Sequence, residues 1–466
     1  MRTQFDLAAA LATLKDENPS RLHLLLHDAV GKENVTAVKQ LMDAGAYPDF
    51  KDERGNTALL VAISAGSTAL AKLLINKDAT LDIRNKDGDT ALHVALRNGH
   101  MEIAALLVDK GATLDVPNGV GNTALHVAAY SGHMDLAKLL IDKGATLDVP
   151  NNYGDTVLHE AARNGHVVLA KLLINKDATL DIRNKEGDTA LHEALRNGHM
   201  EIAKLLVDKG ATLDVRNGVG NTALHVAARN GRMELAKLLV DKGATLDIRN
   251  GVGNTALHEA VLNGRMELAK LLVDKGATLD IRNSDGNTAL HVTAWRGHTD
   301  LAKLLVDKGA TLDVPNSDGN TALHVTAWRG HTDLAKLLVD KGATLDVPNS
   351  DGNTALHVVA DRSCIEIAKL LVDKGATLDV PNGVGNTALH VAAYSGHMDL
   401  AKLLIDKGAT LDVPNNYGDT ALHIAAIKNY AIIAGLLNRA SVSTPGSQRP
   451  ITPSSLAAIR NALGLK

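Results

Sequence analysis

Histidine is the residue type with the most chemical potential in this 466-residue chain, because it occurs 20 times. Imidazole can bind a metal or act as a general acid and base near neutral pH. Twelve of the histidines share one motif position: His27, His93, His126, His159, His192, His225, His258, His291, His324, His357, His390 and His423. Seven more follow a glycine or its equivalent: His100, His133, His166, His199, His298, His331 and His397. Only His23 stands outside both sets.

The spacing of these histidines argues against a metal site. Neighbouring motif positions are 33 residues apart, so a stacked array would offer one motif histidine per unit. Units in contact are about 10 Å apart at ordinary helix spacing. A metal needs three or four converging ligands, which this separation does not allow. We therefore predict a structural role for the histidines, and we expect neither a metal nor a cofactor.

The other candidates for chemistry are also better explained by structure. Asp135, Lys138 and Asp142 are spaced i,i+3 and i,i+4, which is typical of a solvated helix face with ion pairs. No GxGxxG, GxxxxGK[ST], HExxH or GxSxG string occurs, and Cys364 is the only cysteine. The sequence thus predicts no catalytic residues, no intrachain disulfide and a reducing compartment.

A repeated unit of turn, helix, turn and helix must position all these residues. In one copy, Asn118 to Gly121 has turn chemistry and Thr123 is a good cap for a short helix to about Ser131. Gly132 ends that helix, and Met134 to Lys143 predicts a second one. The phrase Thr-Ala-Leu-His or a variant begins at residues 57, 90, 123, 156, 189, 222, 255, 288, 321, 354, 387 and 420, with a weaker copy from Leu24. A fixed period of this length predicts a stacked array.

The repeated string turn-G-x-T-x-L-H-x-A-A-x-x-G-H-x-x-x-A-x-L-L-x-x-G-A resembles the ankyrin repeat from Leu24 to about Ala440. Alanine replaces the family's proline after the motif threonine, with Val157 in one copy, and Thr113 and its equivalents replace an aspartate. The resemblance implies an all-α solenoid of stacked helix-turn-helix units with projecting turns, in which the motif histidine bonds backbone groups between units. We expect an N-terminal helical cap over residues 1–20, an array of about 13 repeats over 21–440, and a Ser/Thr/Pro linker with a short helix over 441–466.

Composition limits the partners. The net charge is −4, without the basic excess that binding to nucleic-acid phosphates requires. No apolar run approaches the roughly 18 residues of a membrane span, and residues 1–20 lack a secretory apolar region. We expect a cytoplasmic monomer that binds protein or peptide, with no membrane partner and nucleic acid as a lesser alternative.

The residues that vary between repeats carry the prediction of a site. By the resemblance, the last two residues of each first helix line a concave face. Both tryptophans lie in this column, together with tyrosines and arginines, the types that dominate binding hot spots. The predicted partner-binding residues are Trp295, Arg296, Trp328, Arg329, Arg362, Tyr394, Arg163, Arg196, Arg229 and Tyr130. The alternative that each tryptophan packs only against an adjoining turn stays open.

The function that follows is a scaffold or adaptor that binds a partner polypeptide, with acidic and apolar residues, in the concave groove. Two alternatives remain. Residues 118–156 repeat identically at 382–420, and such duplicated units resemble effectors or regulators of intracellular bacteria, which act on host proteins in the host cytoplasm. The tail after Ser441 would then be an export signal. The other alternative is a mechanical spacer, in which the groove residues have no role.

Overall fold

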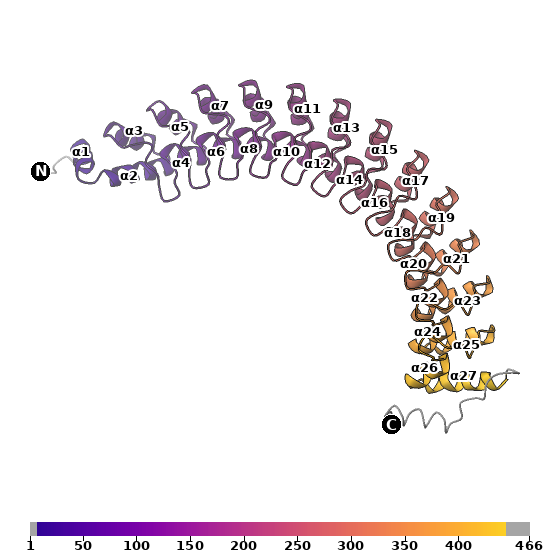
Figure 1. Ribbon diagram of the computed structural model, residues 1–466. Coiled ribbons are helices and arrows are strands. Elements are labelled where there is room, and N and C mark those ends of the chain that lie inside the picture. Colours follow the sequence, from indigo (N-terminus) through magenta and orange to yellow (C-terminus); the bar gives the residue numbers. More distant parts are fainter. Residues whose placement is uncertain (1–6, 444–466) are drawn as a thin grey trace. The chain divides into compact units, whose positions relative to one another are not determined.

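The computed structural model describes residues 7–443, and all regular structure in this range is α-helical, as predicted. The described range holds 27 helices, of which α1 (Leu7–Glu17) precedes the repeats and the others form pairs (Figure 1). The first helices of the pairs are α2 (Pro19–Gly31), α4 (Ala58–Ser64), α6 (Ala91–Arg97), α8 (Ala124–Tyr130), α10 (Val157–Asn164), α12 (Ala190–Asn197), α14 (Ala223–Asn230), α16 (Ala256–Leu262), α18 (Ala289–Arg296), α20 (Ala322–Arg329), α22 (Ala355–Arg362), α24 (Ala388–Ser395) and α26 (Ala421–Ile427). The second helices are α3 (Val35–Asp43), α5 (Thr68–Ile75), α7 (Met101–Asp109), α9 (Met134–Asp142), α11 (Val167–Asn175), α13 (Met200–Asp208), α15 (Met233–Asp241), α17 (Met266–Asp274), α19 (Thr299–Asp307), α21 (Thr332–Asp340), α23 (Ile365–Asp373), α25 (Met398–Asp406) and α27 (Ala431–Ser443).

The chain divides into two compact units. The first comprises Met1–Val226 with Asp241–Ala244, and the second comprises Ala227–Val240 with Thr245–Lys466. Within each unit, first helices follow one another in one row and second helices in a parallel row, with the turn tips beyond the first row (Figure 1). We call each helix pair with its preceding turn a layer.

Both ends of the described chain differ from the middle. At the N-terminal end, the side chain of Asn18 accepts a hydrogen bond from the backbone of Arg21 at 3.1 Å and so caps α2, directly after α1. At the other end, α27 continues to Ser443, which extends it into the predicted linker. The helix predicted for Ser455 to Leu463 lies outside the described residues.

The Thr-x-x-His motif starts each first helix and also joins it to the next layer. In α18, the backbone N–H of Thr288 donates to Nδ1 of His291 at 3.2 Å. Because Nδ1 accepts, Nε2 carries the hydrogen and donates to the carbonyl oxygen of Asn320, 2.9 Å away in the next layer. Burial lowers the pKa of His291 from 6.5 to about 4, so the ring is neutral at pH 7. The inter-unit backbone bonds that the resemblance implies are therefore confirmed.

Leucine and alanine make the layers stack. In the α18–α19 layer, Leu290, Leu301 and Leu305 are almost fully buried, and Ala302 lets the helices approach closely. Each fully buried leucine stabilises the fold by roughly 2 kcal/mol relative to exposure. The two helices of one layer cannot bury their apolar faces against each other alone, so the neighbouring layers must cover the rest. Stability therefore depends on neighbouring layers.

Lysines on the outer surface pair both within one helix, as predicted, and between layers. Lys303 lies 2.9 Å from Asp307 on α19, and Lys369 lies 2.9 Å from Glu366 on α23. Asp142 lies 3.7 Å from Lys176 of the following layer, and Lys143 lies 2.9 Å from Asp109 of the preceding layer. The predicted partner Lys138 is in neither pair. The pairs between layers form because the lysine just after a second helix reaches the last acidic residue of the layer before it. The solvated character of this surface is as predicted, because all these side chains are largely exposed.

Candidate functional site

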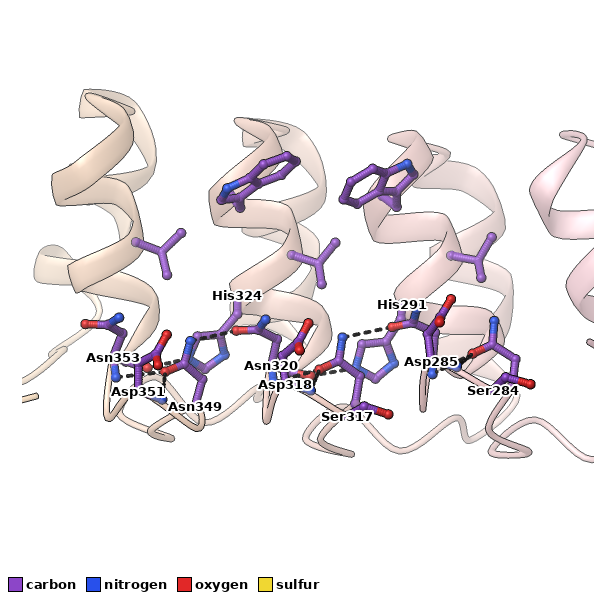
Figure 2. Close-up of a pocket in the computed structure, with 18 of the residues that line it drawn as sticks. Ser284, Asp285, His291, Ser317, Asp318, Asn320, His324, Asn349, Asp351 and Asn353 are labelled. Carbon is purple, nitrogen blue, oxygen red and sulfur yellow. Dashed lines mark hydrogen bonds between the residues drawn. The ribbon is translucent and has the colours of Figure 1, made fainter. Parts of the chain in front are cut away.

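A groove of about 1010 Å³ runs between the turn tips and the first helices of the second unit (Figure 2). It extends from Val252 to Val391 across successive layers. The lining repeats with the sequence period, so each central layer contributes a Ser or Asp tip, an asparagine floor, a wall valine and a residue at the helix end. The wall valines are Val292, Val325, Val358 and Val391. We refer to this site as the groove.

A ladder of asparagines forms the groove floor and fixes the turns. Oδ1 of Asn316 accepts from the backbone N–H groups of Asp318, at 3.0 Å, and of Asn320, at 2.9 Å. Its Nδ2 must then donate, and it does so to Oδ1 of Asn287 in the preceding layer at 2.9 Å. The same bond joins Asn349 to Asn320 (Figure 2). In both bonds the accepting asparagine, Asn287 or Asn320, keeps its Nδ2 group available at the groove, whereas Nδ2 of Asn254 donates to Glu259 at 3.1 Å.

The two tryptophans lie together at the end of the groove wall. Their ring centroids are 5.2 Å apart, and the ring planes of Trp295 and Trp328 are inclined by only 13°, so the indoles stack. The guanidinium of Arg329 lies 4.6 Å from the centroid of Trp295, and that of Arg362 lies 4.6 Å from the centroid of Trp328. The side chains remain 46% and 40% exposed, and both line the groove. Stacking between layers therefore leaves part of each indole open to a partner.

The same register links an aromatic residue to a cation further along the second unit. Nζ of Lys428 lies 3.8 Å from the ring centroid of Tyr394. Tyr394 and Lys428 have the same separation in the sequence as Trp295 and Arg329. Tyr394 is 55% exposed, whereas Tyr130, in a repeat of identical sequence in the first unit, is 74% exposed. Because the repeats themselves match, the residues of the neighbouring layers account for this difference.

The arginines of the first unit are paired with carboxylates of the array. Arg163 lies 2.9 Å from Asp155, 3.1 Å from Glu160 and 3.2 Å from Glu193, and these three carboxylates are largely buried. Burial opposes the charged form, but the bonds and charges of Glu193, Asp155 and Glu160 outweigh it and raise the pKa of Arg163. Burial raises the pKa of the Glu160 carboxyl, because it disfavours the charged form. The positive charge of the Arg163 guanidinium is thus compensated by carboxylates of the protein itself.

The remaining predicted arginines follow the same principle. Arg196 pairs with Asp188 and, at 3.0 Å, with Glu193, in the first unit. Arg229 lies 3.1 Å from Glu259 in the second unit. Sequence reasoning did not identify Asp155 and Asp188, each eight residues before its arginine, as partners. An aspartate directly before the motif threonine was the available signal.

The structure thus places nine of the ten predicted residues in three groups, and Arg229 pairs with Glu259 outside them. Trp295, Trp328, Arg329 and Arg362 come together at the groove. Arg296 is exposed beside them without a ring contact, and Tyr394 pairs with Lys428. Tyr130, Arg163 and Arg196 instead line a smaller pocket of about 540 Å³ in the first unit. Asp285, Asp318 and Asp351, at the groove tips, were not among the predicted residues.

The described residues show neither a metal-binding cluster nor a membrane-spanning helix. Residues 7–443 contain no group of three or more His, Cys, Asp or Glu side chains arranged to hold a metal ion. Within the same residues, no helix has both the length and the apolar character to cross a membrane.

Comparison with known proteins gives one family. A model described as ankyrin repeats (3 copies) matches residues 26–118, 113–184, 169–250, 245–316, 312–382 and 377–445. No curated protein matches the chain.

Proposed function

The chain belongs to the ankyrin-repeat family, whose members generally mediate protein–protein interactions without catalysis, and we propose that it is a scaffold that holds a partner polypeptide in the groove of its second unit. The observation that carries this proposal is the stacked pair Trp295 and Trp328, which lines the groove and stays nearly half exposed. Large, rigid aromatic side chains beside a partly covered apolar wall are typical centres of binding energy.

The hydrogen bonding of the groove supports tight recognition. The asparagine ladder and the motif histidines hold each turn tip on the next layer, as Asn316 and His291 do. The groove therefore exists before a partner arrives, and the array orders few side chains on binding. Such preorganisation reduces the entropic cost of association.

The arginine pairing changes the expected chemistry of the partner. We still expect apolar residues in the partner, as the sequence predicts, because the wall valines and the indoles line the groove. The acidic part loses its support in the first unit, where Arg163 and Arg196 already contact buried carboxylates. Arg329 and Arg362 cover indole faces and contribute first to positioning the rings.

Selection from a library of displayed random peptides tests this function. The purified chain should enrich a set of peptides. The double variant Trp295→Ala with Trp328→Ala should bind these peptides more weakly by more than about 1 kcal/mol, as expected for hot-spot aromatics. The matched control is Tyr153→Ala with Tyr417→Ala, which removes two exposed aromatic rings at turn tips outside the groove.

A second variant guards against a loss of folding in the tryptophan double variant. Val325→Lys keeps both indoles and places a charge on the partly exposed wall, so it should also abolish retention of the peptides. Peptides that bind both groove variants as well as the unmodified chain would refute the proposed site.

A further inference from the structure

The groove presents the same chemistry three times in succession. Ser284-Asp285, Ser317-Asp318 and Ser350-Asp351 form the tips of consecutive layers, and each layer adds a wall valine and an asparagine amide. The three tip aspartates are exposed. The ion pairs that the structure describes in these layers use other carboxylates: Asp307, Asp340 and Asp373 at the ends of second helices, Glu366 on α23 and Asp361 on α22. One lip of the groove therefore carries a regular row of carboxylates that no described cation neutralises.

The repeat distance of this row limits the conformation of a partner. Stacked helices lie about 8–10 Å apart. A polyproline II helix has 3 residues per turn and rises about 3.1 Å per residue, so one turn advances about 9 Å. Every third side chain then faces the same lip, one per layer. A β-strand alternates its side chains with a period of two, so its residues i and i+3 would face opposite sides.

The groove floor offers what a polyproline II backbone needs. That helix has no internal hydrogen bonds, so its carbonyl groups require outside donors. The Nδ2 groups of Asn287, Asn320 and Asn353 are such donors, because the oxygen atom of each amide already accepts from the asparagine of the next turn. They supply one donor per layer, which matches one turn of the partner.

The opposite wall has the apolar and aromatic surface on which proline packs. Val292, Val325 and Val358 are partly exposed, and the indoles of Trp295 and Trp328 continue this wall. Grooves lined by aromatic residues are a common way to bind proline-rich segments, whose stiffness lowers the entropy lost on binding.

From these four features we propose that the groove binds a polyproline II segment in which lysine or arginine recurs at every third position, with proline or aliphatic residues between. The basic side chains pair with Asp285, Asp318 and Asp351, the prolines pack on the valines and indoles, and the carbonyls accept from the asparagine amides. This inference rests on the proposed function and names the class of polypeptide that it concerns.

The test uses synthetic peptides and the fluorescence of the full-length chain. Its only two tryptophans both line the groove, so their emission reports directly on the site. The probe is (Lys-Pro-Pro)4, whose turns of about 9 Å match the spacing of the layers and supply one lysine more than the three tip aspartates. One control, Lys-Pro-Lys-Pro-Pro-Pro repeated twice, has the same composition but a different spacing, and (Glu-Pro-Pro)4 has the opposite charge. We expect the probe to bind at least tenfold more tightly than either control, and increasing salt to weaken it.

Substitution of the tip carboxylates tests the contact itself. The variant Asp285→Asn with Asp318→Asn and Asp351→Asn should bind the probe about tenfold more weakly, which corresponds to about 1.4 kcal/mol. The matched control removes the same charge from exposed aspartates on second helices: Asp300→Asn with Asp333→Asn and Asp399→Asn. That control should bind like the unmodified chain.

The outcomes separate this inference from the proposed function. Equal affinity for the probe and the differently spaced peptide, or an unchanged affinity of the tip variant, would overturn the three-residue pattern. The library selection could still enrich groove-dependent peptides of another class, and the proposed function would then stand. Light scattering during the titration shows whether the chain is a dimer. If the probe binds only after a dimer has dissociated, the groove is occupied by a second copy of the chain, and the inference is overturned.

Discussion

Mild acid should destabilise the layers that contain the motif histidines. His291 is held neutral in the folded chain, where burial lowers its pKa from 6.5 to about 4. The unfolded chain therefore binds more protons than the folded chain between these two values. Stability is at its full value above pH 6.5, falls as the pH decreases through this window, and changes no further through this group below about pH 4.

The magnitude for this single residue follows from the two pKa values. Lowering the pH from 7 to 5 should reduce the free energy of unfolding by about 2 kcal/mol through His291 alone. Burial lowers the pKa of His324 and His357, in the following layers, in the same direction. The pH of 5 stays above the usual range of exposed carboxyl groups, so protonation of aspartates contributes little.

Urea titrations at pH 7 and pH 5, followed by tryptophan emission, measure this loss in the relevant layers. Trp295 lies on the same helix as His291, so the signal reports on the unfolding of that layer. The variant His291→Gln cannot titrate at this position and should lose about 2 kcal/mol less between the two pH values. Equal pH dependence of the variant and the unmodified chain would refute the assignment of the effect to this imidazole, as would an NMR titration of His291 near pH 6.5.

Two further substitutions test the packing between layers. Glu193→Ala should lower the free energy of unfolding of the first unit by about 2 kcal/mol, because Arg163 and Arg196 both lose a buried partner while staying partly solvated; an unchanged urea midpoint would show that the network adds nothing. Gly297→Ala should cost clearly more than Gly342→Ala in the same assay. Both glycines have positive φ, of 73° and 92°, but only at Gly297 would a new Cβ meet the next layer, 2.7 Å from Cε1 of His331. Equal effects would mean that backbone strain alone, about 1–3 kcal/mol, determines the cost.

Most of the fold follows from the sequence because one local rule is repeated. The threonine cap, the glycine after each first helix and the leucine spacing predict α8 as ending near Ser131, and the helix ends at Tyr130. The bonding of the motif histidine to the next layer came from the family resemblance and is confirmed, as with His291 and Asn320. Each of these features acts within one repeat or between two neighbours, so it recurs with the sequence period.

The site is harder to predict, because its chemistry depends on which side chains meet across layers. The column of helix ends identified Trp295 and Trp328, but the stack of the two indoles needs the geometry between layers. The arginine column predicted contacts with an acidic partner, and only the structure pairs Arg163 with Asp155 and Glu193. The role of the predicted residues in binding remains a prediction until a partner is measured.

The contacts between layers have constant sequence offsets. The histidine of one layer reaches 29 residues ahead to a carbonyl, as His291 reaches Asn320, and Lys308 reaches back 34 residues to Asp274. Removing or inserting 33 residues leaves the new neighbours facing each other with the same partners. Recombination between matching segments of the gene, such as those encoding residues 118–156 and 382–420, would therefore change the number of layers without requiring a new interface between layers.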